Sequence, residues 1–102
     1  MSTFAFIYRT PASSNAAPSS ETMNAWYAWF ASMGDNVVDR GNPVFDRTTL
    51  GKSSTDTVLG GYSLIRADDL ESAVALAKGC PALSNGGGVE IGELTIVDGD
   101  SA

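Results

Sequence analysis

The sequence contains no histidine, and only one of its 102 residues, Cys80, is a cysteine. Without histidine, Ser-His-Asp and Cys-His catalysis and histidine metal sites are excluded. A single cysteine cannot close an internal disulfide, and no second thiol lies nearby to complete a metal site. A site made only of carboxylates remains open, but no spacing favours it. The sequence therefore predicts neither a metal nor a cofactor.

Basic residues are also scarce. Six Lys and Arg residues stand against twelve Asp and Glu, which gives a formal net charge of −6. Proteins that bind nucleic acids or anionic membranes usually do so with clustered basic side chains. We therefore expect neither kind of partner. No run of about 18 or more apolar residues is present, and the first ten residues lack the pattern of a signal peptide. These features predict a cytoplasmic protein.

The elements that the sequence does contain alternate in a simple order. Apolar patterning predicts strands over residues 3–9, 36–40, 58–66 and 89–97 and helices between Ser19 and Gly34 and between Asp68 and Lys78. Residues 44–57 have no clear core face, and we expect an irregular segment there. We interpret residues 1–98 as one domain and residues 99–102 as a short polar tail.

Local signals mark where several of these elements begin and end. Ser19 is the predicted N-cap of the first helix, and Gly34 is the predicted residue that ends it. Asp68 and Glu71 have the spacing of a capping box at the start of the second helix. The pair Gly60-Gly61 predicts a β-bulge or a close approach of two backbones.

The order strand, helix, strand, strand, helix, strand predicts an α+β, ferredoxin-like fold. Its antiparallel sheet would carry two helices on one face. The first strand, however, is apolar on both sides, since Phe4, Phe6 and Tyr8 share one face and Ala5 and Ile7 share the other. A second copy of the same sheet is the simplest cover for the open face, so we expect a homodimer formed through the sheet faces.

Several stretches carry a resemblance to a known family. LGGYSLIRADDLESAVALAKGCP, followed by GGGVEIGEL, is similar to the C-terminal half of the YCII-related family, which includes the DGPF-type members. SSETMNAWYAWFASMG and VVDRGNP resemble its N-terminal half more loosely. The resemblance covers residues 3–96 and implies a dimeric α/β barrel, in which two ferredoxin-like sheets pack face to face.

For function the resemblance implies little, because most members of the family have no assigned activity. In some members a histidine on the first helix and an aspartate before the proline that ends the second helix were inferred to act as an acid-base pair. The corresponding positions here are Ala25 or Trp26 and Cys80, and no DGPF tetrapeptide is present. The presumed chemistry of the family is therefore not carried by this chain.

Two tryptophans on one short helix exceed what a small core requires. Aromatic residues at this spacing more often belong to a core than to a ligand site. Their number here nevertheless suggests a ligand pocket between the first helix and the sheet, where the barrel family tends to bind ligands. The candidate lining residues are Tyr8, Trp26, Trp29 and Tyr62. Arg40 and Asp56 are candidate polar groups for this pocket, together with Arg9 and Asp39.

Other motifs are better explained without a function. Gly51-Lys52-Ser53 resembles the end of a phosphate-binding loop, but Asp46 occupies the position of the glycine that such a loop requires. The glycines at 86–88 lack the spacing of a dinucleotide-binding motif. Cys80 follows a helix C-terminus, where the helix dipole disfavours a thiolate, and Pro81 is interpreted as a stop signal.

Two classes of function remain. The first is a homodimeric, non-catalytic protein that binds a small, partly apolar molecule between the first helix and the sheet. The alternative is a cofactor-free enzyme of the isomerase, lyase or monooxygenase type, which would use Asp, Asn, Tyr or Arg in an aromatic pocket. The absence of histidine favours the first.

Overall fold

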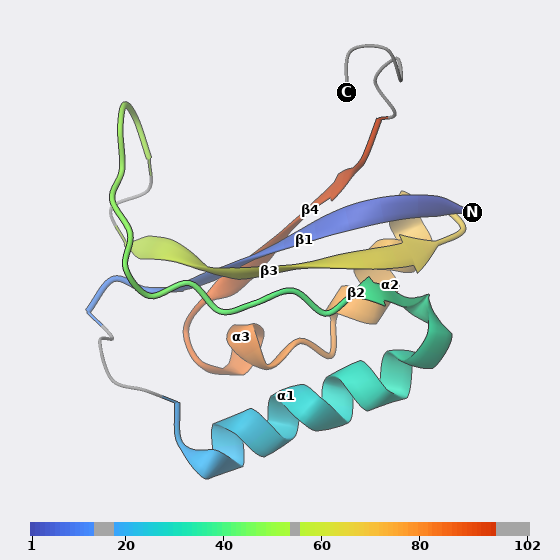
Figure 1. Cartoon of the computed structure of the whole chain (residues 1–102), viewed down its shortest axis with the longest axis horizontal. Coiled ribbons are helices and arrows are strands. Elements are labelled where there is room, and N and C mark those ends of the chain that lie inside the picture. The colour runs from blue at the N-terminus through green and yellow to red at the C-terminus, as the bar shows by residue number, and fades with distance from the viewer. Residues whose placement is uncertain (14–17, 54–55, 96–102) are drawn as a thin grey trace.

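The computed structural model describes residues 1–13, 18–53 and 56–95, and Figure 1 shows their arrangement. Its elements in chain order are β1 (Ser2–Pro11), α1 (Ser20–Met33), a 3-10 turn η1 (Gly34–Asn36), β2 (Val37–Asp39), β3 (Thr57–Ala67), α2 (Leu70–Ala77), α3 (Pro81–Ser84) and β4 (Gly88–Glu93). Among the helices within these ranges, none is both long enough and apolar enough to cross a membrane.

The strands form one antiparallel sheet in the order β2-β3-β1-β4. The two longest strands, β1 and β3, lie side by side in the middle, and α1 runs beneath them in Figure 1. This order and orientation confirm the predicted α+β, ferredoxin-like fold.

A single core joins the helices to one face of the sheet. Alternate residues of β1, beginning at Phe4, are buried, and they pack with residues of α1 and α2. Trp29 of α1 is 6% exposed, stacks on Phe6, and donates its indole N–H to the carbonyl oxygen of Leu76 at 3.0 Å. The buried members of the core are Phe4, Phe6, Tyr8, Trp29, Met33, Ile65, Ala67, Ala73, Ala77, Cys80 and Ala82.

The predicted β-bulge is present. Tyr8 of β1 pairs with Gly61, but the next residue, Arg9, pairs with Leu59, so that Gly60 is the extra residue. Residues 44–53 have no regular secondary structure, as predicted, although Pro43 forms an isolated bridge with Gly61. The strand β4 ends at Glu93, earlier than predicted, and residues 96 and 97 lie outside the described residues, as does the predicted polar tail.

Both predicted ends of the first helix are confirmed. The side chain of Ser19 accepts a hydrogen bond from the backbone amide of Thr22 at 3.1 Å, which satisfies one of the unpaired amides of the first turn. Gly34 has φ of 53°, in the left-handed region that favours glycine, and its N–H donates to the carbonyl oxygen of Phe30.

The predicted cap of the second helix was wrong by one residue. Asp69, not Asp68, is the N-cap of α2, and its carboxylate accepts from the backbone amide of Ser72 at 2.8 Å. Both residues are aspartates that precede the same apolar stripe, so spacing alone favoured the one that has a glutamate three residues later. Glu71 lies in the first turn of α2, where its negative charge is favourable.

The interpretation of Pro81 as a simple stop was also incomplete. Pro81 is the first residue of a further short helix, α3, which the sequence patterns did not predict. Proline suits this position because the first amide of a helix has no intrahelical partner. The helix α3 contacts α1, β1 and β4, so it forms part of the layer that covers the sheet.

Replacing Asp69 with alanine is expected to lower the melting temperature by a few degrees, whereas Asp68→Ala is expected to leave it nearly unchanged. The hydrogen bonds from Ser72 lower the pKa of Asp69. Because the pKa is lowered in the folded state, the stabilisation by this cap is complete above the ordinary pKa of 3.8. It is lost as the pH falls through the lower pKa of the folded state. Thermal unfolding at pH 7 and pH 3 tests this. A larger loss from the Asp68 variant would contradict the assignment of the cap.

Candidate functional site

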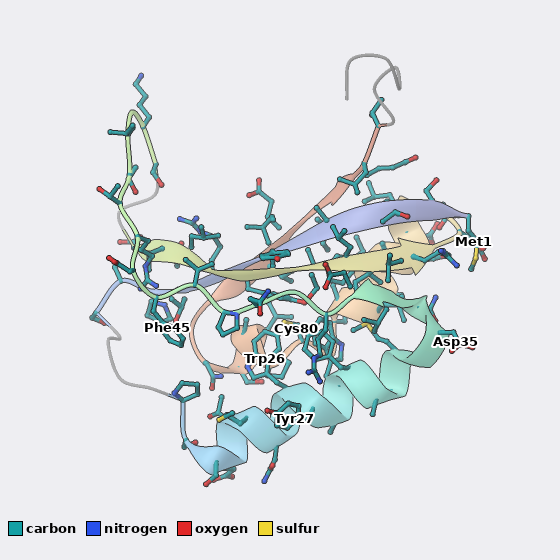
Figure 2. All side chains as sticks on the ribbon, in the orientation of Figure 1. Met1, Trp26, Tyr27, Asp35, Phe45 and Cys80 are labelled. Atoms are coloured by element: carbon teal, nitrogen blue, oxygen red, sulfur yellow. The ribbon has the colours of Figure 1, made fainter. Side chains whose placement is uncertain are left out.

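A cavity of about 680 Å³ lies between the N-terminal half of α1 and the adjoining ends of β1 and β3. The loop 40–47 and the segment 82–87 complete its walls. Figure 2 shows Trp26 and Phe45 in the space between α1 and the strands. The volume is typical of a site for a small organic molecule. The larger side chains of its lining are those of Tyr8, Arg9, Met23, Trp26, Tyr27, Phe30, Arg40, Phe45, Arg47 and Tyr62.

Aromatic side chains form the inner wall of this cavity. The ring of Trp26 meets that of Tyr8 edge to face, with 4.8 Å between the ring centroids, and lies 6.0 Å from that of Phe30. Trp29 backs both Tyr8 and Trp26 from the core, with centroid separations of 5.9 and 5.6 Å. Each ring is held by its neighbours, so the wall is formed before any ligand arrives.

The hydroxyl of Tyr8 is fixed by a short chain of hydrogen bonds. It donates to the Oγ of Ser63 at 2.8 Å, and Ser63 donates in turn to the backbone carbonyl oxygen of Arg40 at 2.6 Å. Burial raises the pKa of Tyr8 above its ordinary value, because a phenolate would be poorly solvated there. Tyr8 therefore remains a neutral donor, and its hydrogen bonds tie the loop 40–47 to the sheet.

Three arginines come to the same cavity from different elements. Arg9 at the end of β1 donates from Nε to the Oγ1 of Thr57 at 3.2 Å and from Nη2 to the carbonyl oxygen of Thr57 at 2.9 Å. The guanidinium carbon of Arg40 lies 5.6 Å from the ring centroid of Tyr27, a cation–π contact that joins the loop to α1.

Arg47 is the third arginine of this set, and its Nη1 donates to the carbonyl oxygen of Val44 at 2.7 Å.

The loop 40–47 approaches the sheet closely at Gly41. This residue has φ of 73°, and a Cβ at its position would clash with the carbonyl oxygen of Tyr62. Glycine is thus required where the loop turns toward the strand.

The lining determines which chemistry the cavity supports. Among the described residues that line it, none is Asp, Glu, Lys or Cys, and the ionisable side chains are those of tyrosine and arginine. Arginine stays protonated at neutral pH, and Tyr8 holds its proton. The cavity can bind a planar molecule and stabilise negative charge, but these lining residues offer no group that readily accepts a proton near neutral pH.

The six candidate site residues lie in different surroundings. Tyr8, Trp26, Arg40 and Tyr62 line the cavity. The register pairs Tyr62 with Ile7, so that its ring lies on the sheet face opposite Tyr8, although the residue also borders the cavity. Trp29 lies behind the wall in the core, and Asp56 is not among the lining residues.

The contribution of the loop 40–47 beyond Arg40 was not predicted from the sequence. Phe45 and Arg47 both line the cavity. They lie in a segment with no helical or strand periodicity, so no pattern indicated which way their side chains point. The one available signal was the closely spaced pair of arginines at positions 40 and 47 in a chain with few basic residues.

Cys80 lies apart from the cavity. Its side chain is buried in the core, 2% exposed, at the N-terminus of α3. Burial raises the pKa of its thiol to about 11, although hydrogen bonds from the backbone amides of Ala82 and Leu83 act in the opposite direction. The helix dipole that we expected to disfavour the thiolate is therefore not the main cause.

No protein-family model and no curated protein matches the chain. Comparison with solved structures gives 5-chloro-2-hydroxyhydroquinone dehydrochlorinase (TftG) from Burkholderia phenoliruptrix AC1100, in a complex with 2,5-dihydroxybenzoquinone. The two chains superpose with a TM-score of 0.58 over 92% of this chain and 95% of that chain, at 16% sequence identity. At this identity the likeness shows a shared α+β, ferredoxin-like fold, and the YCII-related resemblance stays a prediction.

Proposed function

We propose that the protein binds a small, partly apolar, planar molecule in the cavity between α1 and the sheet, and that it does so as a homodimer. The observation that carries the proposal is the wall formed by Tyr8, Trp26 and Phe30, which presents aromatic surface to a cavity of about 680 Å³. Aromatic surface in a concave site is favourable for planar ligands, because ring stacking adds to the burial of apolar area.

The solved structure with the same fold supports a ligand of this size, since its complex contains 2,5-dihydroxybenzoquinone, a single planar ring. That protein is named a dehydrochlorinase, and this favours the alternative of a cofactor-free lyase. The described side chains that line the present cavity weigh against it, because elimination requires a base and none of them is a carboxylate, a lysine or a cysteine. Binding without acid-base catalysis is therefore the function that we propose.

Trp26→Ala is expected to weaken binding of planar aromatic compounds by about tenfold or more, because it removes the ring at the centre of the wall. Binding can be measured by calorimetry with 2,5-dihydroxybenzoquinone, with benzoate and 2-naphthoate, and with benzamide and 2-naphthamide as probes. Leu70→Ala is the matched control, since Leu70 is an exposed side chain of α2 that does not line the cavity.

The unmodified protein should also report the site directly. In ¹H–¹⁵N spectra the indole resonance of Trp26 should move more on titration than that of Trp29, whose N–H is engaged with Leu76. If no probe binds, or if Trp26→Ala leaves every affinity unchanged, the proposal is wrong. Conversion of a bound probe, followed by mass spectrometry, would favour the enzyme.

A further inference from the structure

The charge of the cavity is opposite to that of the chain. The whole chain carries six basic and twelve acidic residues. Yet the lining of the cavity, within the part of the chain that the structure describes, contains the three arginines Arg9, Arg40 and Arg47 and no Asp or Glu. Half of the basic residues of an acidic protein are thus placed around one aromatic cavity. Arg9 and Arg47 are half-buried, and half-buried cations are costly unless they are paired, so packing of a core does not account for their placement.

Within residues 1–13, 18–53 and 56–95, the contacts that hold these arginines in place are made with uncharged groups. Arg9 is held by the hydroxyl and the carbonyl of Thr57, Arg40 by the ring of Tyr27, and Arg47 by the carbonyl of Val44. These partners orient the guanidinium groups without neutralising them, which is how a site for an anion is prepared in advance.

Two of the arginines also indicate where the charge of a ligand would lie. Arg9 and Arg47 line a second, smaller cavity of about 310 Å³ as well, and Phe45 belongs to both. The remaining lining of the smaller cavity includes the hydroxyl residues Thr48, Thr49 and Ser53. Arg9 and Arg47 therefore lie where the main cavity borders a smaller cavity that carries hydroxyl groups, whereas the wall around Trp26 is aromatic.

We propose that the ligand of this cavity is a small organic anion, namely a planar ring or conjugated system that bears a carboxylate or an ionised enol or phenol. Its apolar body packs on Tyr8 and Trp26, and its negative group binds between Arg9 and Arg47, with Arg40 adding positive charge at the side of α1. This inference rests on the proposed function, because it specifies the occupant of the same cavity.

The test compares acids with amides of the same shape. 2-Naphthoate and 2-naphthamide, and benzoate and benzamide, differ chiefly in charge. We expect each acid to bind at least about tenfold more tightly than its amide. We also expect the affinity of the acid, but not that of the amide, to fall as the salt concentration rises.

Variants locate the charge. Arg47→Gln and Arg9→Gln should each weaken binding of the acids by about tenfold and leave the amides unchanged, whereas Arg47→Lys should restore part of the loss. Lys78→Gln is the control, because Lys78 is an exposed side chain at the end of α2, outside the cavity lining, and its substitution removes the same charge from the chain. Melting temperatures establish whether each variant is folded. Arg9→Gln loses the contacts with Thr57, and if it does not fold, Arg47→Gln alone tests the proposal.

The two proposals fail in different ways. If acids and amides bind equally and both depend on Trp26, the cavity is a ligand site but the anion preference is wrong. If Lys78→Gln weakens the acids as much as Arg47→Gln does, the effect is one of net charge, and the assignment to Arg9 and Arg47 is overturned. If neither acids nor amides bind, the proposed function itself fails, and this inference fails with it.

Discussion

Iodoacetamide is expected to alkylate Cys80 in the folded protein at pH 7 at least about 100-fold more slowly than it alkylates an unhindered thiol. The thiolate is the reactive form, and burial raises the pKa of this thiol from 9.0 to about 11, so that the thiolate population falls by about 100-fold. Burial of the sulfur within the core slows the reaction further, since the reagent must reach it.

The dependence on pH separates the two causes. For a free thiol with its ordinary pKa of 9.0 the alkylation rate levels off about one pH unit above that value, whereas for Cys80 it should continue to rise through pH 11. Protein unfolded in guanidinium chloride is the control and should react at the ordinary rate.

The raised pKa also makes stability depend on pH. The contribution of the Cys80 thiol to stability is complete below the pKa of 9.0 that it has in the unfolded chain, and it is lost as the pH rises through the folded-state pKa of about 11. Rapid alkylation at pH 7 with a titration midpoint below about 7 would make Cys80 a reactive centre and would contradict its assignment to the core.

Ile7→Lys is expected to convert a homodimer into a monomer. Sedimentation of the unmodified protein at micromolar concentration should give about twice the chain mass of 10.6 kDa. The basis is the sheet face opposite the helices, where Ala5 and Ile7 lie in register with Leu64 and Tyr62. Arg66 and Glu90 also lie on this face, but its centre is apolar. The helices that the structure describes pack on the other face, so association of two copies would bury this apolar centre.

The substitution is chosen so that the protomer itself is preserved. Ile7 is paired with Glu90 of β4, so a lysine at position 7 gains a partner of opposite charge within the same sheet. In a face-to-face dimer the same lysine and Glu90 would both be removed from water, which is costly for the two charges. Leu83→Lys is the control, because Leu83 is an exposed residue of α3 in the helical layer. A monomer before any substitution, or a dimer that persists in Ile7→Lys, would contradict this interface.

The fold could be predicted from the sequence because its signals are local. The alternation of Phe4, Phe6 and Tyr8, the cap at Ser19 and the glycine at position 34 each depend on neighbours a few residues away. The same kind of signal misplaced the second cap, since two adjacent aspartates satisfy nearly the same pattern and only the backbone geometry selects Asp69.

The cavity could be predicted only in part, because its other side depends on contacts between distant segments. The tryptophans of α1 stood out through composition and spacing. The position of the loop 40–47 is instead set by hydrogen bonds and packing across the chain, such as that from Ser63 to the carbonyl of Arg40 and the close approach of Gly41 to Tyr62. No periodicity within the loop records these contacts, which is why Arg47 and Phe45 were not foreseen.

Tyr62 has a position that joins two surfaces of the protein. It borders the cavity, whereas the register places its ring beside Ile7 on the open face of the sheet, and the residue is 37% exposed. In a dimer formed through that face, if a bound ligand changed the affinity between the two protomers by way of this residue, dimerisation would change the affinity for the ligand by the same factor, because linkage is reciprocal. Added ligand would then shift the protein concentration at which dimers form, and dilution of the protein would shift the apparent affinity for the ligand.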